Sequence, residues 1–421
     1  MRLALACALL VAACTPAPAS REQPKSGPSP SLYLTASLDG SGLIAIDPLT
    51  LGDISNRQLL TGTPSDMPSC PVGGPCALVA PSGDGRSLAV VGYEAKGPPA
   101  IFIFDTRTGS LRSRPIPEVP VIVDGLNADG SRLYTRAWPP TSLTAERLVL
   151  DGSNGKIVDR ESAFSVGGEE VATLIDSEQR RIYALVVAAD PQAIGPRQVA
   201  ASAWDLKTGT ALWRREIPGL IAGSWLTGRT GAEGDIRTRL VPGLALSPDG
   251  RRLAIVRAFD CCVVAGTYWL LDTTSGDLSA ERKYSRGTSI LEQVFGAIAA
   301  AKEDDGVTVG ASFGPDGQVL YITGQSWKPD GYQYLGMTAL DVESTKVLGS
   351  DIKMEQWWYE NHVFWLRRPS ADGRWLYVFL QRTGNADPKG YFLRRVDART
   401  LSVAAERRFD SYRFAFSLFG P

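Results

Sequence analysis

Histidine is almost absent from this chain of 421 residues, in which His362 is the single example. Metal sites built from several imidazoles are therefore excluded, and any Ser-His-Asp chemistry would depend on that one residue. The six cysteines form no CxxC or CxxCH pattern, and there is no P-loop. From the sequence we assign no catalytic residue, no metal and no cofactor.

An excess of charge of one sign is also missing, because 44 basic residues face 45 acidic ones and the net charge is -1. Nucleic-acid binding needs a positive field or a basic stripe, and neither is present. We therefore expect no nucleic-acid partner.

What the chain does contain is a sequence repeat. A short apolar strand ends in an aspartate and is followed by a D-x-x-T-G-like turn, in which the carboxylate accepts amide hydrogens and a glycine reverses the chain. We number these repeats 1 to 7 by their aspartates, Asp47, Asp105, Asp151, Asp205, Asp272, Asp341 and Asp397.

A second motif precedes six of the seven aspartates. It consists of two strands separated by a tight turn, typified by Ser247–Gly250 (S-P-D-G), where proline presets φ and glycine carries no Cβ penalty. Repeat 1 lacks this half, but residues 414–417 (FAFS) resemble residues 244–247 (LALS). We therefore expect the C-terminal strand to complete the sheet that the N-terminal strand begins at residues 32–36.

A period of about 40 to 50 residues with four short strands is typical of propeller blades. The fold class expected is all-β, a seven-bladed β-propeller of four-stranded blades, closed by N- and C-terminal strands in one blade. Through the S-P-D-G and D-x-x-T-G elements the chain resembles YVTN-type and WD-repeat-like propellers over nearly all of its length after residue 30. The resemblance implies a fold but no single function, since such propellers include binding proteins and enzymes.

The N-terminus has the pattern of an export signal. Arg2 precedes a short apolar run, and residues 11–14 (VAAC) match a bacterial lipobox. We expect a lipoprotein signal peptide at 1–13, acylation of Cys14, a Pro/Ser-rich tether at 14–30 and the propeller at 31–421. A disordered start or a misplaced initiation codon is the alternative. The location expected is the cell envelope, lipid-anchored on the extracytoplasmic side of a bacterial membrane.

The remaining cysteines suit an oxidising compartment. Cys70 and Cys76 flank a compact PVGGP segment and are disulfide candidates. Cys261 and Cys262 are adjacent, so they form either a vicinal disulfide, two free thiols or a soft-metal pair.

The two faces of the expected ring differ in the length of their connections. Both short turns lie on one side, the turn face, whereas every long insertion lies on the other, the insertion face, where function is expected. The insertions span residues 61–75, 94–99, 138–146, 188–197, 219–239, 258–266, 284–306, 324–336, 353–362 and 382–390. Within them, helical spacing predicts a helix over 290–302, and Glu303–Asp305 forms either a solvated helix exit or a cation site.

Aromatic residues are concentrated in two neighbouring insertions of repeats 6 and 7. We expect Trp327, Tyr332, Trp357, Trp358, Tyr359 and His362 to converge on one rim of the insertion face. Such rings either recognise sugars, cations or protein surfaces by stacking, or fill the core beneath the insertions.

The function favoured is therefore a membrane-tethered binding or scaffold module that presents its insertion face to a protein, peptide or glycan. The alternative is an extracytoplasmic propeller enzyme, either a lactonase-like hydrolase or the propeller subunit of a quinoprotein amine dehydrogenase-like complex. The missing catalytic motifs and the single histidine favour binding.

Overall fold

The computed structural model is all-β in every part that it describes. It describes residues 32–38, 40–58, 79–82, 86–92, 100–106, 108–119, 121–127, 129–137, 146–160, 167–176, 178–190, 193–227, 236–257, 265–285, 306–328, 331–350, 360–361, 366–370, 372–384, 390–409 and 414–419. No helix long and apolar enough to cross a membrane occurs in these ranges.

Four repeats form separate four-stranded antiparallel sheets. Repeat 1 has the order β3 (Asp53–Gln58), β2 (Gly40–Ile46), β1 (Leu32–Leu38), β30 (Phe414–Phe419). Repeat 2 runs β4 (Val79–Pro81), β5 (Ser87–Gly92), β6 (Ala100–Asp105), β7 (Leu111–Ser113). Repeat 3 runs β8 (Val121–Leu126), β9 (Arg132–Ala137), β10 (Glu146–Asp151), β11 (Ile157–Arg160). Repeat 5 runs β17 (Gly243–Leu246), β18 (Arg252–Val256), β19 (Ala265–Asp272), β20 (Leu278–Ser285).

The other three repeats belong to one continuous sheet of 14 strands. Repeat 4 supplies β12 (Glu169–Asp176), β13 (Arg181–Val187), β14 (Arg197–Asp205), β15 (Ala211–Thr227). Repeat 6 supplies β21 (Gly306–Phe313), β22 (Val319–Lys328), β23 (Gly331–Asp341), β24 (Val347–Ser350). Repeat 7 supplies β26 (Leu366–Pro369), β27 (Trp375–Gly384), β28 (Gly390–Asp397), β29 (Val403–Phe409). Two further strands, β16 (Ile236–Val241) and β25 (Glu360–Asn361), join these repeats.

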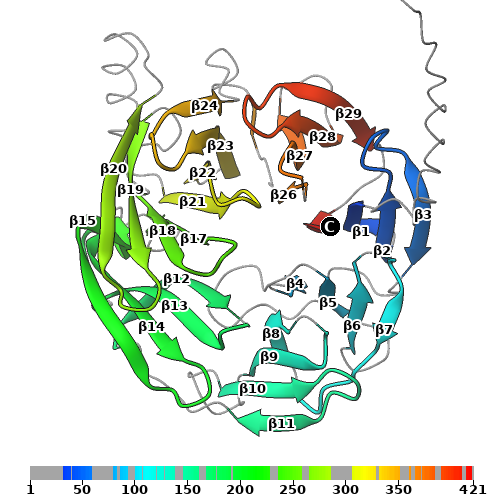
Figure 1. Ribbon diagram of the computed structural model, residues 1–421, viewed down its shortest axis with the longest axis horizontal. Helices are drawn as coiled ribbons and strands as arrows, with labels where there is room; N and C mark the ends of the chain where they lie inside the picture. The colour runs from blue at the N-terminus through cyan, green and yellow to red at the C-terminus, as the bar shows by residue number, and fades with distance from the viewer. Residues whose placement is uncertain are drawn as a thin grey trace, which may run out of the picture.

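The sheets follow one another around a ring, and the strands on its inner side are β30, β4, β8, β12, β17, β21 and β26 (Figure 1). Contacts join these inner strands from one repeat to the next, between β30 and β4, β4 and β8, β8 and β12, β12 and β17, β17 and β21, and β26 and β30. The arrangement is propeller-like, as the repeat period predicts.

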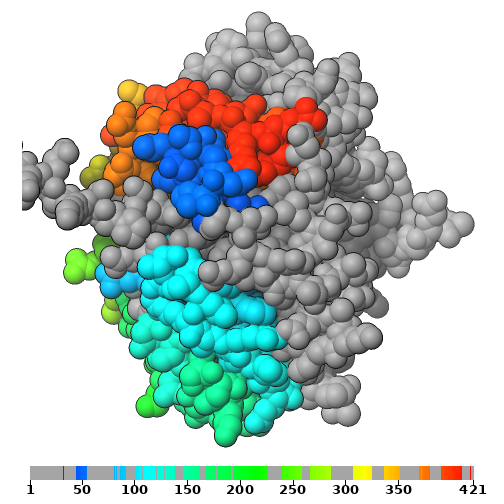
Figure 2. Space-filling view, turned by 90° about the vertical axis from the view of Figure 1, so that its right-hand side faces the viewer, coloured from blue at the N-terminus to red at the C-terminus, as the bar shows by residue number. Residues whose placement is uncertain are grey.

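The two ends of the described chain meet in the sheet of repeat 1. Strand β30 pairs antiparallel with β1, in a register that includes Tyr33 with Phe419 and Ser37 with Phe414. Figure 2 shows the blue N-terminal residues packed directly against the red C-terminal ones. The strand missing from repeat 1 is thus supplied by the C-terminal segment.

The core lies between neighbouring sheets, because each strand alternates its side chains between two flanking repeats. The junction of repeats 4 and 5 is an example, where Tyr183 and Leu185 pack in one cluster with Ile255 and Trp269, all at most 1% exposed. The short strands carry apolar side chains on both faces. Each sheet therefore buries its apolar side chains only when a sheet packs on either side of it.

The D-x-x-T-G turns act as junctions, as the turn of Asp272 shows. The Asp272 carboxylate accepts hydrogen bonds from the backbone N–H groups of Thr274 (2.8 Å) and Ser275 (2.9 Å). Gly276 has φ 72°, and a Cβ there would lie 2.5 Å from the Trp213 ring of repeat 4. The same indole donates from Nε1 to the carbonyl of Thr273 (2.9 Å). The turn therefore closes the hairpin of repeat 5 and also packs against Trp213 of repeat 4.

Two insertions expected from the sequence to be loops are instead largely strands. In 219–239, β15 continues to Thr227 and pairs with β16, and in 324–336 β22 and β23 continue as a paired hairpin. The sequence predicted these segments as insertions because they lengthen the connections, but the glycines within them do not end the strands. Gly223, for example, has φ 108° inside β15.

Candidate functional site

The insertion face carries a backbone ladder that crosses from repeat 4 to repeat 7. We call it the bridged rim and define it by one row of successive register partners: Gly223, Leu240, Val307, Ser326, Gln333, Asn361 and Thr383. The β15–β16 arm passes from repeat 4 to repeat 6, and β25 links β23 to β27. Among the described residues of repeats 1, 2, 3 and 5, the sheets share no ladder, and repeats 2 and 3 are linked by one isolated bridge between Ser82 and Leu126.

A polar cluster anchors the arm where β15 bends. The Glu169 carboxylate accepts from the backbone N–H (3.1 Å) and the hydroxyl (2.9 Å) of Ser224, and it pairs with the Arg197 guanidinium. Arg197 also donates to the Ser224 carbonyl (3.0 Å). Gly223 has φ 108°, which favours glycine, and a Cβ there would approach the same guanidinium to 2.7 Å and so displace Arg197 from this cluster.

A second charged cluster lies beside the first, between repeats 3 and 4. The Asp124 carboxylate accepts hydrogen bonds from Arg136 Nε (2.7 Å to Oδ2) and Nη2 (2.7 Å to Oδ1). The Arg147 guanidinium lies 3.7 Å from the Asp124 carboxylate and 3.9 Å from the Glu170 carboxylate. Glu169 and Glu170 are adjacent on β12, so one strand contributes an acid to the cluster within repeat 4 and another to the pair with Arg147 of repeat 3. Paired charges of this kind hold geometry and leave little free charge for a ligand.

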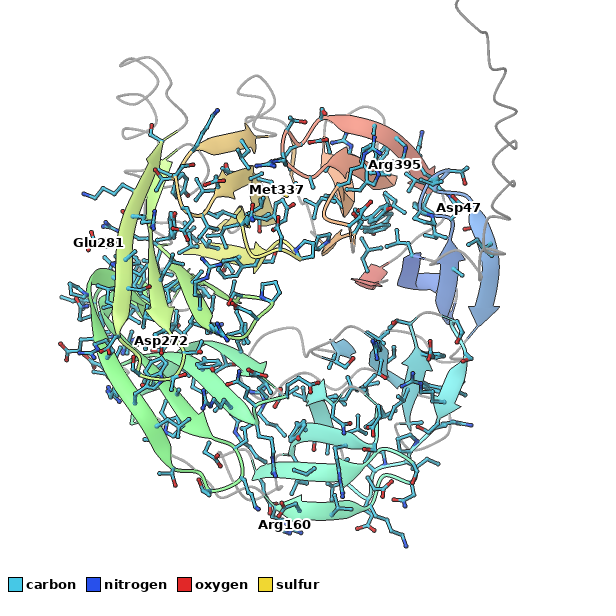
Figure 3. The ribbon with its side chains drawn as sticks, viewed as in Figure 1. Asp47, Arg160, Asp272, Glu281, Met337 and Arg395 are labelled. Atoms are coloured by element: carbon cyan, nitrogen blue, oxygen red, sulfur yellow. The ribbon has the colours of Figure 1, made fainter. Side chains whose placement is uncertain are left out.

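The turn face, in contrast, uses its carboxylates for structure. The backbone N–H of Thr50 lowers the pKa of Asp47, with further help from Leu49 and from the charge of Arg395. Arg395 reaches across from repeat 7 to donate to the Leu49 carbonyl (2.6 Å), and Figure 3 shows it beside Asp47. Arg407 adds a bidentate pair with Asp53 (2.7 Å to each oxygen).

Two of the predicted aromatic residues lie in the register pair next to the bridged rim. Trp327 and Tyr332 are opposite one another in the β22–β23 ladder, and Asn361 pairs with Gln333. The structure therefore brings together the two insertions of repeats 6 and 7 in which the sequence placed the aromatic rim. The other predicted residues, Trp357, Trp358, Tyr359 and His362, lie outside the described residues.

Several other predictions also lie outside the described residues. These are the lipidation site Cys14, the disulfide candidates Cys70, Cys76, Cys261 and Cys262, the helix over 290–302 and the acidic run 303–305. They stay predictions.

Neither a hydrolase nucleophile nor a metal site is formed by the described residues. Residues 310–314 (GASFG) match the G-x-S-x-G spacing of a hydrolase nucleophile, a pattern that sequence reasoning passed over. Ser312 pairs with Tyr321 inside β21, however, and not in the strand-to-helix turn which that motif requires. No group of three or more His, Cys, Asp or Glu side chains in these ranges is placed to hold a metal ion.

No family model matches the chain, and no curated protein matches it. Three solved structures share its general arrangement. Hydrazine synthase of Kuenenia stuttgartiensis is 15% identical, with 79% of this chain and 78% of that one covered and a TM-score of 0.41. A putative 6-phosphogluconolactonase from Bacteroides fragilis is 14% identical, with 95% and 100% covered and a TM-score of 0.44. The dihydro-heme d1 dehydrogenase NirN is 10% identical, with 95% and 77% covered and a TM-score of 0.48. At these levels the likeness carries no argument about function.

Proposed function

We propose that the chain is a membrane-tethered binding module, a closed seven-bladed propeller that presents its insertion face to a protein, peptide or glycan. The pairing of β1 with β30 and the inner-strand contacts support the closed ring. In this proposal each of the seven repeats forms one blade, and a lipid on Cys14 attaches the module to the membrane.

The observation that carries the binding role is the bridged rim. A propeller needs no backbone ladder between its blades, because side-chain packing already joins neighbouring sheets. Here the ladder occurs where strands extend beyond the repeat pattern, on the face opposite the turns. Functional residues are commonly placed on such additions to a regular scaffold. The bridged rim is therefore the surface at which we place the partner.

The position of the N-terminal strand supports the same orientation. Leu32 pairs with Ile46, directly before the turn of Asp47, so β1 begins on the turn face. A tether that precedes β1 leaves from that face, and the bridged rim then lies on the side away from the membrane. No described feature favours the alternative of an enzyme, and we do not propose it.

Site-specific photo-crosslinking tests this function in the tethered protein. Thr308, an exposed residue next to the rim row, and Thr274, an exposed residue of a turn, would each be replaced by benzoylphenylalanine. We expect a defined crosslinked product, or protection by an added ligand, from position 308 and not from 274. Equal products from both positions, or from neither, would contradict the proposal.

A further inference from the structure

The turn face carries an exposed leucine at a position that is polar in every other repeat. Leu49 is the second residue after the turn aspartate of repeat 1 and is 65% exposed. The Asp47 carboxylate accepts hydrogen bonds from the backbone N–H groups of Leu49 (2.8 Å) and Thr50 (2.7 Å), so an ordered turn presents the leucine to solvent. The corresponding residues of the other repeats are Arg107, Ser153, Lys207, Thr274, Glu343 and Arg399.

A tryptophan lies at the adjoining turn of repeat 7. Trp375 begins β27 directly after the turn of residues 370–373, and it is only partly buried against the core cluster between repeats 7 and 1. The guanidinium carbons of Arg374 and Arg395 lie 4.9 Å and 4.6 Å from the centre of its ring. Arg395 also donates to the Leu49 carbonyl (2.6 Å) and so links the tryptophan to the leucine turn. We call Leu49, Arg374, Trp375 and Arg395 the junction patch.

The charges at the junction patch are balanced. The three turns that meet here, residues 47–53, 370–375 and 397–402, contain four aspartates and two arginines. Two further arginines, Arg395 and Arg407, donate hydrogen bonds to the first of these turns. The patch therefore has no net charge with which to attract an anionic partner, and its distinguishing features are the leucine and the indole.

The N-terminal strand places the junction patch beside the proposed tether. Strand β1 begins at Leu32, which pairs with Ile46 next to the turn that carries Leu49. Cys14 precedes Leu32 by 18 positions, so a lipid on Cys14 would lie at most about 60 Å from this end of β1. A lipid anchor would therefore hold this part of the turn face, rather than the repeats across the ring, closest to the membrane.

We propose that the junction patch docks the tethered propeller on the surface of the lipid bilayer. An indole ring and a leucine suit the interfacial region of a bilayer, and arginine side chains can lie along an aromatic ring while their charged ends stay in water. Two such side chains bind a membrane weakly by themselves, but a tether raises their effective concentration at its surface. The inference rests on the proposed tethering and assigns the orientation of the tethered protein. A protein partner at the same patch is the outcome that would replace it.

Photo-crosslinking in the lipidated full-length protein tests the docking. Leu49 would be replaced by benzoylphenylalanine, and the matched control is Thr274, the exposed residue at the same position of the repeat 5 turn. The protein would be placed in vesicles of phosphatidylcholine, and in vesicles of phosphatidylethanolamine with phosphatidylglycerol. We expect about tenfold more lipid adduct from position 49 than from position 274. The yield should be similar in both kinds of vesicle, because the charges of the patch are balanced.

A conservative variant gives a second measurement. Leu49→Ser changes an exposed residue, so the fold should be kept, and docking can be followed by the quenching of tryptophan fluorescence by phosphatidylcholine with brominated acyl chains. We expect the ratio of docked to undocked protein to fall about fivefold, as the apolar area of one leucine predicts. Leu212→Ser, a change of an exposed leucine on the outer strand of repeat 4, is the control and should leave quenching unchanged.

The docking and the tether fail differently in these experiments. If mass spectrometry finds no lipid on Cys14, the proposed tethering fails and the docking fails with it. If Cys14 carries lipid but position 49 gives no more lipid adduct than position 274, or gives a protein adduct instead, only the docking is wrong. Adducts that form only with phosphatidylglycerol would also contradict it, because they would show that charge drives the contact.

Discussion

The β15–β16 arm is anchored by the polar cluster of Glu169, Arg197 and Ser224. This anchor gives a prediction that separates the local stability of the arm from the global stability of the protein. In Glu169→Gln the carboxylate charge is lost, while the size of the side chain is kept. Glu169 accepts from Ser224 twice and pairs with Arg197, whose side chain is only 14% exposed. Hydrogen bonds to charged groups are worth about 1.5–3 kcal/mol each. The Glu169 side chain is 29% exposed and glutamine retains an acceptor, so we expect a net cost of about 2 kcal/mol.

A cost of that size, confined to the arm, should accelerate amide hydrogen exchange about thirtyfold in peptides from residues 219–241. The melting temperature should fall by only about 2–4 °C, because the rest of the ring is unaffected. The control is Glu170→Gln, the adjacent change on β12, where the pair with Arg147 is 3.9 Å long and the acid is 34% exposed. If exchange in the arm is unchanged by Glu169→Gln, or rises equally in both variants, the anchor does not hold the arm.

Three further predictions concern the junctions. Tyr268→Phe removes a buried hydrogen bond to the Val342 carbonyl (2.8 Å) and should cost about 1–2 kcal/mol in a denaturant titration. Burial raises the pKa of Tyr268 to about 12, so stability should fall as the pH rises from 10 towards 12, and the Phe variant should lose part of that slope. Gly276→Ala brings a Cβ to 2.5 Å from Trp213 at φ 72° and should lower the melting temperature clearly more than an alanine at the exposed Thr274. Deleting residues 414–421 removes β30 and should cost on the order of 5 kcal/mol, and an unchanged melting temperature would argue against the closed ring.

The parts of the fold that sequence could predict are those that repeat. Turn chemistry at Ser247–Gly250 and at the aspartates depends on residues within five positions of one another, so it is readable locally. The structure contains these turns, as the bonds around Asp272 show. Strand β30 also followed from the repeat, because one copy lacked its first half.

The bridged rim could not be predicted in the same way. Strand β25 has two residues, and it is a strand only because β23 and β27 supply hydrogen bonds from both sides. Strand β16 pairs in parallel with β21 over two residues, about 65 positions further along the chain. The segments 219–239 and 324–336 were predicted as insertions because of their length, although neighbouring strands were available to satisfy the backbone.

The anchor was missed for a related reason. Glu169 and Ser224 are separated by 55 residues and belong to no motif. In the sequence each is an ordinary polar residue beside an insertion. They form one cluster only because β12, β14 and β15 lie close together in the folded sheet. The sequence by itself therefore contains no pattern that indicates this contact.

Neighbouring repeats are joined either by side-chain contacts alone or also by backbone hydrogen bonds. This difference is the reason that we place the binding face over repeats 6 and 7. Repeats 7 and 1 are joined at their turns by hydrogen bonds from arginine side chains such as Arg395 and Arg407. Repeats 6 and 7 are also joined through backbone hydrogen bonds of β25, which restrict the backbone itself. A surface already held in one arrangement loses less conformational entropy when it binds. The part of the bridged rim that contains β25 belongs to this restrained backbone, so a partner bound there as we propose meets a surface whose backbone is already ordered.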